Sequence, residues 1–252
     1  KLEEFSDKLE LVVTLKKYNK GFKKDLNGKI VVEKYDCLAE YLNINIKNII
    51  IPNQSHTDNI LCIKKGSNKI QINKEKDLLN IDGTITNVNK IAIASTFADC
   101  IPIFFYDPVK NVIGNIHSGW VGTTKKISIK ALQTLKKEYD CNLKNIIVLI
   151  GPCIRKDHFL VNEDVKKIFE EKFSKFLNRY DIITKTDMYN EKGIQYMIGN
   201  VEINKQMLIE CGILEKNIID SKICTVCQSN CFHSRRAEGK NFDVNTGVIM
   251  LK

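Results

Sequence analysis

Short apolar runs rich in β-branched residues recur along the chain, and they constrain its fold more than any other sequence feature. A run of this kind, bounded by turn residues, predicts a strand buried in a sheet. The predicted strands cover residues 11–15, 49–51, 60–63, 91–97, 101–106, 112–116 and 146–150. We expect helices to cover the sheets that these strands form.

Amphipathic helices are predicted where apolar residues recur at helical spacing. They lie at residues 35–42, 127–135, 163–173 and 201–211. Asn162 is the expected N-cap of the third helix, and Gly212 is expected to end the fourth in a left-handed conformation. Residues 176–200 show no sustained period and predict only a short strand near Tyr196.

Three consecutive predicted strands, 91–97, 101–106 and 112–116, are separated by short turn-forming segments. Such connections are typical of antiparallel neighbours, so we expect a meander. Strand 112–116, helix 127–135 and strand 146–150 then form a strand, helix, strand unit. The pattern as a whole predicts an α/β (α+β) fold, a layered sandwich of mixed sheets flanked by helices.

The amino-acid composition indicates how many domains to expect and which kinds of partner are excluded. The 252 residues are 43% hydrophobic, with 4 prolines, 13 glycines and no low-complexity tract, so we expect one domain covering residues 1–252. Basic residues outnumber acidic ones by 39 to 30, which gives a net charge of +9. Because these charges are scattered and form no arginine-rich stripe, they predict a solvated surface rather than a nucleic-acid interface.

The cysteine count and the absence of long apolar runs predict the compartment. No run approaches the roughly 18 apolar residues needed to span a bilayer, and the N-terminal residues are charged, unlike a signal peptide. Nine cysteines, an odd number in a chain too large to need disulfides, indicate reduced thiols. We therefore expect a cytoplasmic protein, not associated with membranes, in which cysteines are available for metal binding.

Two of the four histidines and one cysteine stand at or between predicted strand ends, where α/β folds place functional groups. His56 follows strand 49–51, His117 follows strand 112–116, and Cys100 lies between two strongly apolar strands. Two imidazoles and one thiolate form a zinc-binding set that leaves a fourth position open, as in catalytic sites. The alternative is two structural histidines and a buried free thiol.

Asp99 is expected to support this site. It lies between the same two apolar strands as Cys100, where an unpaired acid is costly. A zinc-bound imidazole commonly donates its second ring proton to a carboxylate. We therefore predict His56, Cys100 and His117 as metal ligands, and Cys100, His117 and Asp99 as the catalytic residues.

A second cysteine-rich segment is a rival metal site. Cys224, Cys227, Cys231 and His233 show the spacing C-x-x-C-x-x-x-C-x-H, which resembles a compact zinc or iron–sulfur clamp. One short loop seldom supplies every ligand of a tetrahedral ion, and the sequence contains no second C-x-x-C pair. The alternative is a set of partly buried reduced thiols.

Other polar residues stand out as candidate ligand contacts. Arg235 and Arg236 offer adjacent guanidinium groups, which suit phosphate or carboxylate. Asn204 lies on the predicted buried face of helix 201–211, where its amide must be paired, either inside the protein or with a ligand. No phosphate-binding glycine loop, G-x-S-x-G or H-E-x-x-H motif is found, which excludes the commonest nucleotide-binding, serine-hydrolase and protease signatures.

Several motifs in a fixed order resemble a known family from about Gln54 to the C-terminus. They are Gln54-Ser55-His56, Asp82-Gly83, Ala98-Asp99-Cys100-Ile101-Pro102, His117-Ser118-Gly119-Trp120, Gly151-Pro152-Cys153-Ile154, Cys224-Thr225 and Ser234-Arg235-Arg236. The chain resembles the bacterial proteins called multicopper polyphenol oxidases or laccase-domain proteins, which are regarded as purine nucleoside phosphorylases with adenosine deaminase activity.

This resemblance implies a specific function. It implies one zinc ion held by His56, Cys100 and His117, a fold similar to that of cysteine-hydrolase-like toxins, and inorganic phosphate as co-substrate. The implied reactions are phosphorolysis of adenosine, inosine, guanosine and S-methyl-5'-thioadenosine to the free base and (methylthio)ribose 1-phosphate, and deamination of adenosine. The predicted substrate contacts are Gln54, Asn204, Arg235 and Arg236, in a monomer or weak homodimer.

The sequence departs from the family pattern at Val121, where the family usually has an arginine that could contact phosphate or substrate. Two other functions are alternatives. One is a hydrolase acting on an amide of a cell-wall precursor, which an open zinc site would also suit. The other is a nonenzymatic protein that binds metal or nucleotide, in which the zinc would lack an exchangeable fourth ligand. A copper-dependent phenol oxidase would need many more than the four histidines present.

Overall fold

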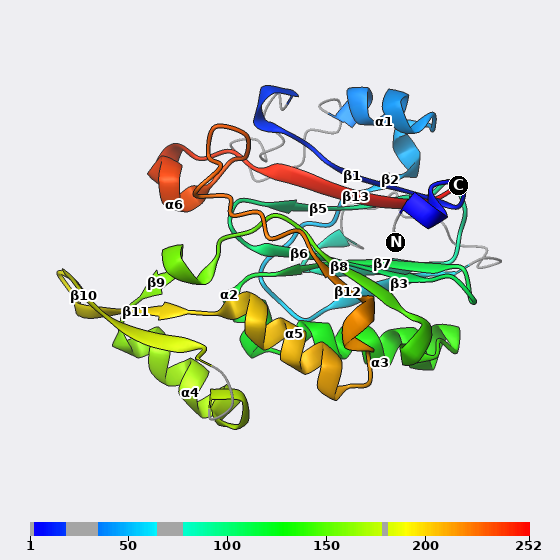
Figure 1. Cartoon of the computed structure of the whole chain (residues 1–252). Helices are drawn as coiled ribbons and strands as arrows, with labels where there is room; N and C mark the ends of the chain where they lie inside the picture. The colour runs from blue at the N-terminus through cyan, green and yellow to red at the C-terminus, as the bar shows by residue number, and fades with distance from the viewer. Residues whose placement is uncertain (1–2, 19–34, 65–77, 178–180) are drawn as a thin grey trace.

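The strands of the computed structural model form three sheets (Figure 1), described over residues 3–18, 35–64, 78–177 and 181–252. The four-stranded sheet has the order β1 (Leu9–Val13), β13 (Asn245–Leu251), β5 (Ala92–Phe97), β2 (Ile49–Ile50). The six-stranded sheet has the order β12 (Ile218–Asp220), β8 (Ile147–Ile150), β6 (Ile101–Asp107), β7 (Val112–Ser118), β4 (Gly83–Thr86), β3 (Ile60–Ile63). A small sheet has the order β10 (Ile183–Asn190), β11 (Gly193–Ile198), β9 (Leu160–Val161).

Both large sheets are mixed. In the six-stranded sheet β12 is parallel to β8 and β3 is parallel to β4, whereas β6 is antiparallel to both β7 and β8. In the four-stranded sheet β2 runs parallel to β5, and β13 runs antiparallel to β5. The predicted antiparallel pair formed by strands 101–106 and 112–116 is confirmed as β6 and β7.

The predicted meander is wrong at its first step, because β5 and β6 belong to different sheets. The chain crosses between the sheets at Ala98-Asp99-Cys100, where Asp99 has a φ of +85°. Both strands are almost wholly buried, so their apolar side chains fit two facing sheets as well as two neighbouring strands. This crossing places Cys100 at the corner where the two sheets meet.

The helices of the described residues are α1 (Asp36–Leu42), α2 (Trp120–Thr124), α3 (Ile127–Tyr139), α4 (Glu163–Leu177), α5 (Asn200–Glu210) and α6 (Arg235–Glu238). Helices α1 and α3 cover the outer faces of the two large sheets (Figure 1). Helix α1 packs on the four-stranded sheet through Leu38 and Leu42, and α3 packs on the six-stranded sheet through Leu132 and Leu135. The predicted layered sandwich of mixed sheets and helices is therefore confirmed.

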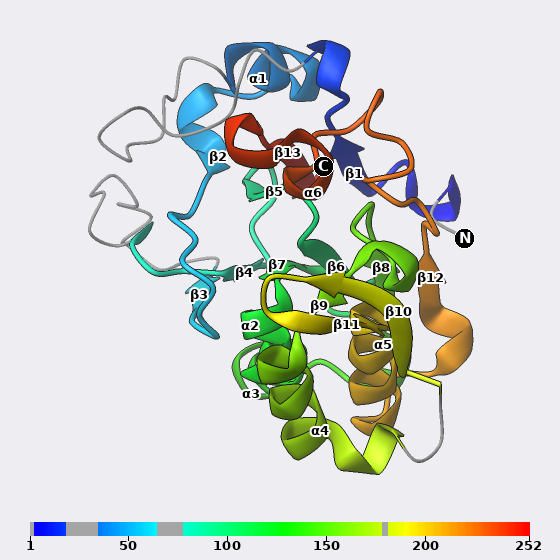
Figure 2. The same cartoon turned by 90° about the vertical axis from the view of Figure 1, so that its left-hand side faces the viewer.

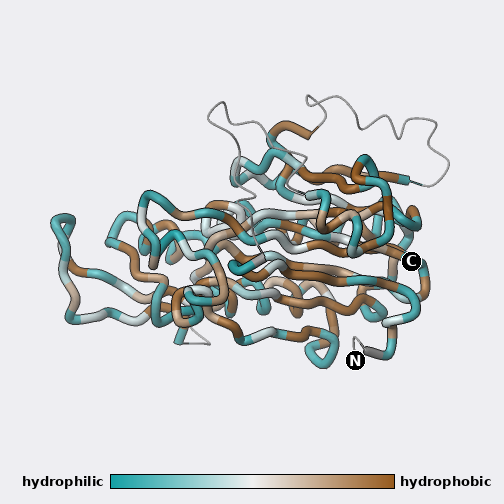
Figure 3. The backbone as a smooth tube through the Cα atoms, turned by 90° about the horizontal axis from the view of Figure 1, so that it is seen from above, coloured by the Kyte–Doolittle hydropathy of each residue, from teal (hydrophilic) through white to brown (hydrophobic). Residues whose placement is uncertain are grey.

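Hydrophobic residues fill the space between the two large sheets. Ile93 of β5, Phe104 of β6 and Ile249 of β13 belong to one buried cluster. Figure 3 shows the hydrophobic stretches concentrated along these central strands. None of the helices in the described ranges is long and apolar enough to span a membrane.

One end of the sandwich carries the smaller elements. The hairpin of β10 and β11 and helix α4 project there, in front of the large sheets in Figure 2. The strand expected near Tyr196 is β11, and β10 completes a hairpin that the sequence did not predict. Short 3₁₀ turns connect other elements: η1 (Glu3–Phe5), η2 (Lys16–Tyr18), η4 (Ile46–Asn48), η6 (Leu143–Asn145), η7 (Lys156–His158), η8 (Glu215–Asn217) and η9 (Gly239–Asn241).

Candidate metal centre and adjoining cavity

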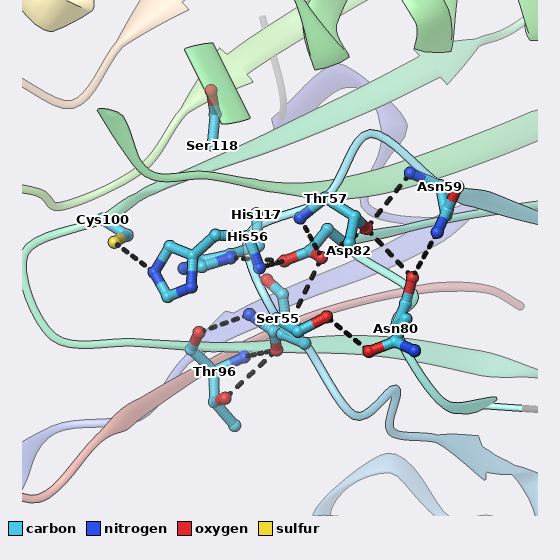
Figure 4. Close-up of polar contacts among 12 residues, drawn as sticks. Ser55, His56, Thr57, Asn59, Asn80, Asp82, Thr96, Cys100, His117 and Ser118 are labelled. Atoms are coloured by element: carbon cyan, nitrogen blue, oxygen red, sulfur yellow. Dashed lines mark hydrogen bonds and ion pairs between the residues drawn. The ribbon is translucent and has the colours of Figure 1, made fainter. Parts of the chain in front are cut away.

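The fold brings the three predicted metal ligands together from three separate segments (Figure 4). His56 lies in the loop after β2, Cys100 lies between β5 and β6, and His117 lies within β7, one residue before its end. One ligand atom from each lies within 4.8 Å of the other two. The distance from Cys100 Sγ to His56 Nε2 is 3.8 Å, and the two imidazole ring centres are 4.9 Å apart. Such a convergent set of two nitrogens and one sulfur suits a zinc ion.

Asp82 orients His117. Its Oδ1 lies 2.9 Å from His117 Nδ1, and both side chains are buried. Because this carboxylate holds the proton on Nδ1, Nε2 is the ring nitrogen of His117 that is available to bind a metal ion.

The same carboxylate shapes the loop that carries His56 (Figure 4). Asp82 accepts hydrogen bonds from the backbone N–H groups of Ser55, His56 and Thr57, and from the Thr57 hydroxyl. Burial raises the pKa of Asp82, but the hydrogen bonds from His117 and Thr57 outweigh it and hold this pKa far below its ordinary value. Asp82 therefore keeps its negative charge and fixes both histidines relative to each other.

Cys100 and His117 stabilise each other's charged forms. Burial lowers the pKa of His117, but the charge of the Cys100 thiolate and the hydrogen bond to Asp82 raise it to about 9. Burial raises the pKa of Cys100, but the charge of His117 and the hydrogen bonds of both histidines lower it to about 6. At neutral pH the two side chains therefore form a thiolate–imidazolium pair, and a metal ion that binds there displaces the proton from Nε2 of His117.

Gly119 leaves the space that these ligands need. A Cβ atom at this position would lie 2.9 Å from Cys100 Sγ and 2.9 Å from the Cδ2 atom of His56. Real Cβ atoms essentially never approach other atoms this closely. Since the φ of Gly119 is −68°, a conformation open to any residue, the glycine is needed here for space and not for its backbone freedom.

Asp99 does not take the role predicted for it. Its Oδ1 accepts a hydrogen bond of 2.6 Å from the Thr225 hydroxyl, and its Oδ2 accepts one of 2.7 Å from the Arg236 backbone N–H. Asp82, not Asp99, is the carboxylate bound to His117. Asp99 is paired, as its burial requires, but its partners come from the C-terminal segment, which the local sequence around Asp99 does not reveal. Asp99 instead fixes the turn that presents Cys100.

A cavity of about 620 Å³ adjoins Cys100. Its volume lies within the range of about 300–1,000 Å³ that is typical of small-molecule sites. Its walls come from the β5–β6 turn, α2, β9, α4 and α6, and include Asp99, Cys100, Trp120, Phe159, Leu160, Arg235 and Arg236. A candidate metal ligand, an aromatic ring and two arginine side chains therefore line the same cavity.

The two predicted arginines play different parts in this wall. The Arg236 guanidinium donates hydrogen bonds to the carbonyls of His158 and Leu160, so it ties two segments together. The Arg235 guanidinium lies 5.8 Å from the centre of the Phe242 ring. Within the described residues, no hydrogen bond or ion pair engages this guanidinium group, and the Arg235 side chain lines the cavity.

The other two predicted substrate contacts are used inside the protein. Gln54 exchanges hydrogen bonds with the backbone N–H and carbonyl of Thr96 in β5. The Asn204 amide is fully buried and is paired with Ser118, Ser128, Thr123 and the Asn200 carbonyl. Neither residue lines the cavity beside Cys100. For Asn204, the geometry matches the structural alternative to ligand contact.

Residues 12–252 match the family described as multi-copper polyphenol oxidoreductase laccase. The chain belongs to this family. The match confirms the resemblance carried by the motifs, and it extends toward the N-terminus as far as residue 12, so it includes α1 and the end of β1.

Named relatives share most of the chain. A Borreliella burgdorferi protein called purine nucleoside phosphorylase is 30% identical over 234 residues, which are 92% of this chain and 88% of that protein. Adenosine deaminase RL5, from an unknown prokaryotic organism, is 25% identical over 205 residues, which are 81% of this chain and 75% of RL5. The crystal structure of the Bacillus licheniformis hypothetical protein YfiH has a TM-score of 0.82 and 24% identity, covering 99% of this chain and 95% of that one.

The rival cysteine site of this laccase-family chain is only partly as predicted. Cys224 and Cys227 lie close together, but their third partner is His158 of η7. His233 pairs with Glu238 instead, and Cys231 lies outside the group. His158 is separated from the two cysteines by more than 60 residues of sequence, so spacing within one loop could not identify it.

The sequence did not predict the roles of three residues at the candidate metal centre and its cavity: Asp82, Gly119 and Trp120. Asp82 belongs to one of the family motifs, and an acid directly before a buried strand indicates a buried carboxylate that needs hydrogen-bond donors. Gly119 and Trp120 belong to the motif around His117, but their roles depend on contacts made in space. Local sequence carries no signal for those contacts.

Proposed function

We propose that this chain is a zinc-dependent enzyme that processes purine nucleosides. The observation that carries the proposal is the donor set of His56, Cys100 and His117, which opens at Cys100 into a cavity that also contains Trp120 and Arg235. Two relatives, one called a purine nucleoside phosphorylase and one called an adenosine deaminase, support this substrate class. Two imidazoles and one thiolate favour zinc, and four histidines in the whole chain are too few for a multi-copper centre.

The proposed reactions are the phosphorolysis of adenosine, inosine, guanosine and S-methyl-5'-thioadenosine, and the deamination of adenosine. Phosphorolysis transfers the ribosyl group from the base to inorganic phosphate. The products are the free base and ribose 1-phosphate, or its methylthio counterpart. Deamination replaces the purine amino group by oxygen from water and releases ammonia.

Each residue of the site has a separate proposed role. A zinc ion bound by His56, Cys100 and His117 would supply Lewis-acid chemistry at the cavity mouth. Asp82 holds the proton of His117 at Nδ1, so Nε2 stays a ligand. Trp120 offers an aromatic surface on which a purine can stack.

Arg235 is the proposed anion contact. It lines the cavity, and no carboxylate within the described residues neutralises it. Val121 in α2 supplies no charge, so phosphate binding in this chain rests more heavily on Arg235. Arg236 helps indirectly, because its side chain holds the cavity wall at His158 and Leu160.

Product chromatography tests the proposal. Purified protein is incubated with adenosine or inosine, with and without inorganic phosphate. We expect free base and ribose 1-phosphate only when phosphate is present, and inosine from adenosine in either case. A protein that binds zinc yet forms neither product would contradict the proposal, and would favour the amide hydrolase or the nonenzymatic binder.

Substitution of Arg235 by alanine tests the anion contact. The variant should raise the KM for phosphate about tenfold, since one charge-assisted contact is lost, while deamination of adenosine continues. Lys240→Ala is the matched control, because Lys240 is an exposed cation of η9 that does not line the cavity. Equal phosphate KM values for Arg235→Ala and wild type would remove Arg235 from the anion site.

A further inference from the structure

A second group of metal-binding side chains lies behind the cavity wall. It consists of His158 in η7 and of Cys224 and Cys227 in the loop after β12. One ligand atom from each lies within 4.8 Å of the others. This group shares no residue with His56, Cys100 and His117, and the proposed nucleoside chemistry does not use it.

The distances fit a tetrahedral zinc ion. Zinc–sulfur bonds of about 2.3 Å and zinc–nitrogen bonds of about 2.0 Å at a tetrahedral angle place the sulfur and nitrogen about 3.5 Å apart. Nδ1 of His158 lies 3.6 Å from Cys224 Sγ and 3.8 Å from Cys227 Sγ. The side chains would need little movement to bind the ion.

Hydrogen bonding alone does not account for this arrangement. A ring nitrogen of neutral imidazole carries either one lone pair or one N–H, and either lies in the ring plane. Two sulfur atoms converge on the same Nδ1 of His158, so only one of them can form a good hydrogen bond with it in either tautomer. A cation placed between the three atoms would bind the nitrogen and both sulfurs as thiolates at once.

The backbone holds the cysteine turn in place. Cys224 forms a parallel bridge with Cys153, which follows β8. The Cys153 N–H donates to the Ile223 carbonyl, and the Thr225 N–H donates to the Cys153 carbonyl. The C-x-x-C turn is therefore anchored to the end of the six-stranded sheet, and such preorganisation lowers the cost of metal binding.

We propose that His158, Cys224 and Cys227 bind a second zinc ion that clamps the cavity wall. The set of one imidazole and two thiolates is among the donor sets that zinc prefers. Cys227 is exposed, so the fourth position of the ion faces solvent and takes water.

This clamp would join segments that shape the cavity. The His158 carbonyl accepts a hydrogen bond from Arg236, and Phe159 and Leu160 line the cavity directly after it. Thr225, between the two cysteines, donates to Asp99, which precedes Cys100. A zinc ion at the second site thus fixes both the wall and the turn that presents Cys100.

Zinc counting on reduced protein tests the proposal. After dialysis against a weak chelator, mass spectrometry should find two zinc ions per wild-type chain, one in Cys227→Ser, one in Cys100→Ala and none in the double variant. Cys231→Ser is the matched control, since Cys231 lies in the same loop but outside the group, and it should keep two. One zinc per chain in both wild type and Cys227→Ser would overturn the proposal.

Cobalt replacement gives a second readout that does not depend on enzyme activity. Cys100→Ala protein loaded with Co²⁺ should show the absorption of thiolate-bound tetrahedral cobalt, and His158→Asn in the same background should lose it. A Cys224–Cys227 disulfide in freshly purified protein, together with no cobalt absorption after reduction, would contradict the second site.

Discussion

At the scale of single residues, one carboxylate sets the geometry of the candidate metal centre. Asp82 accepts hydrogen bonds from His117, from the Thr57 hydroxyl and from three successive backbone N–H groups of the His56 loop. It therefore fixes a ligand side chain and a ligand-bearing loop at the same time. Carboxylates that orient ligating imidazoles typically contribute 10- to 100-fold to metal affinity.

Replacing Asp82 by asparagine should therefore weaken zinc binding about 10- to 100-fold, because a neutral amide loses the charge-assisted bond to His117 Nδ1. Competition with a chromogenic chelator measures the affinity. Asp58→Asn is the control, since Asp58 lies in the same loop but forms none of these contacts, and its affinity should match wild type. If Asp82→Asn also matches wild type, Asp82 does not support the metal centre.

The close contacts of Gly119 predict that any side chain at this position weakens zinc binding. In Gly119→Ala the new Cβ must displace Cys100 Sγ or the His56 ring, so zinc affinity should fall about tenfold or more while the fold is kept. Gly122→Ala tests whether alanine in this segment is harmful in itself, since a Cβ there meets no atom closer than 3.4 Å. Equal zinc affinities for the two variants would show that the space beside Gly119 is not needed by the ligands.

At the scale of elements, Asn115 links the two large sheets. It lies buried in β7, its amide donates 3.0 Å hydrogen bonds to the carbonyls of Ile93 in β5 and Gly247 in β13, and its oxygen accepts from Ser95. These bonds bridge the apolar layer that otherwise separates the sheets. Because the ligands come from both sides of this layer, Asn115 also helps to hold them in register.

Substitution of Asn115 by alanine should lower the free energy of unfolding by about 2–4 kcal/mol, through lost hydrogen bonds, an unsatisfied Ser95 hydroxyl and a new cavity. Urea unfolding followed by circular dichroism measures the change. Asn89→Ala removes an exposed asparagine and should cost less than about 1 kcal/mol. A similar small cost for Asn115→Ala would mean that the sheets need no polar link.

Sequence predicted the elements whose burial follows a simple pattern. Strands β3, β6 and β7 and helix α3 are near their predicted positions, because continuous apolar runs and helical periods report burial directly. Strands β4 and β12 are short, and β13 begins with Asn245, Thr246 and Gly247, which are buried in spite of their type. The β10–β11 hairpin projects from the molecule, so its polar strands give no hydrophobic period.

At the scale of the whole molecule, the sequence did not predict which sheet each strand joins. The three-residue crossing at Ala98-Asp99-Cys100 is as short as a hairpin loop, yet it joins different sheets. The candidate metal ligands could be proposed from their types and positions at strand ends. The contacts of Asp82 with His117, of Thr225 with Asp99 and of His158 with Cys224 could not be predicted, because each joins segments that are distant in sequence.

We propose that zinc bound by His56, Cys100 and His117 drives the nucleoside chemistry of this family member. The most direct test measures zinc content and adenosine turnover together in wild type, in Cys100→Ala and in Cys211→Ala, a control at the end of α5. We predict that Cys100→Ala loses one zinc ion per chain and all turnover, while Cys211→Ala keeps both. Wild-type zinc content with full turnover in Cys100→Ala would contradict the account.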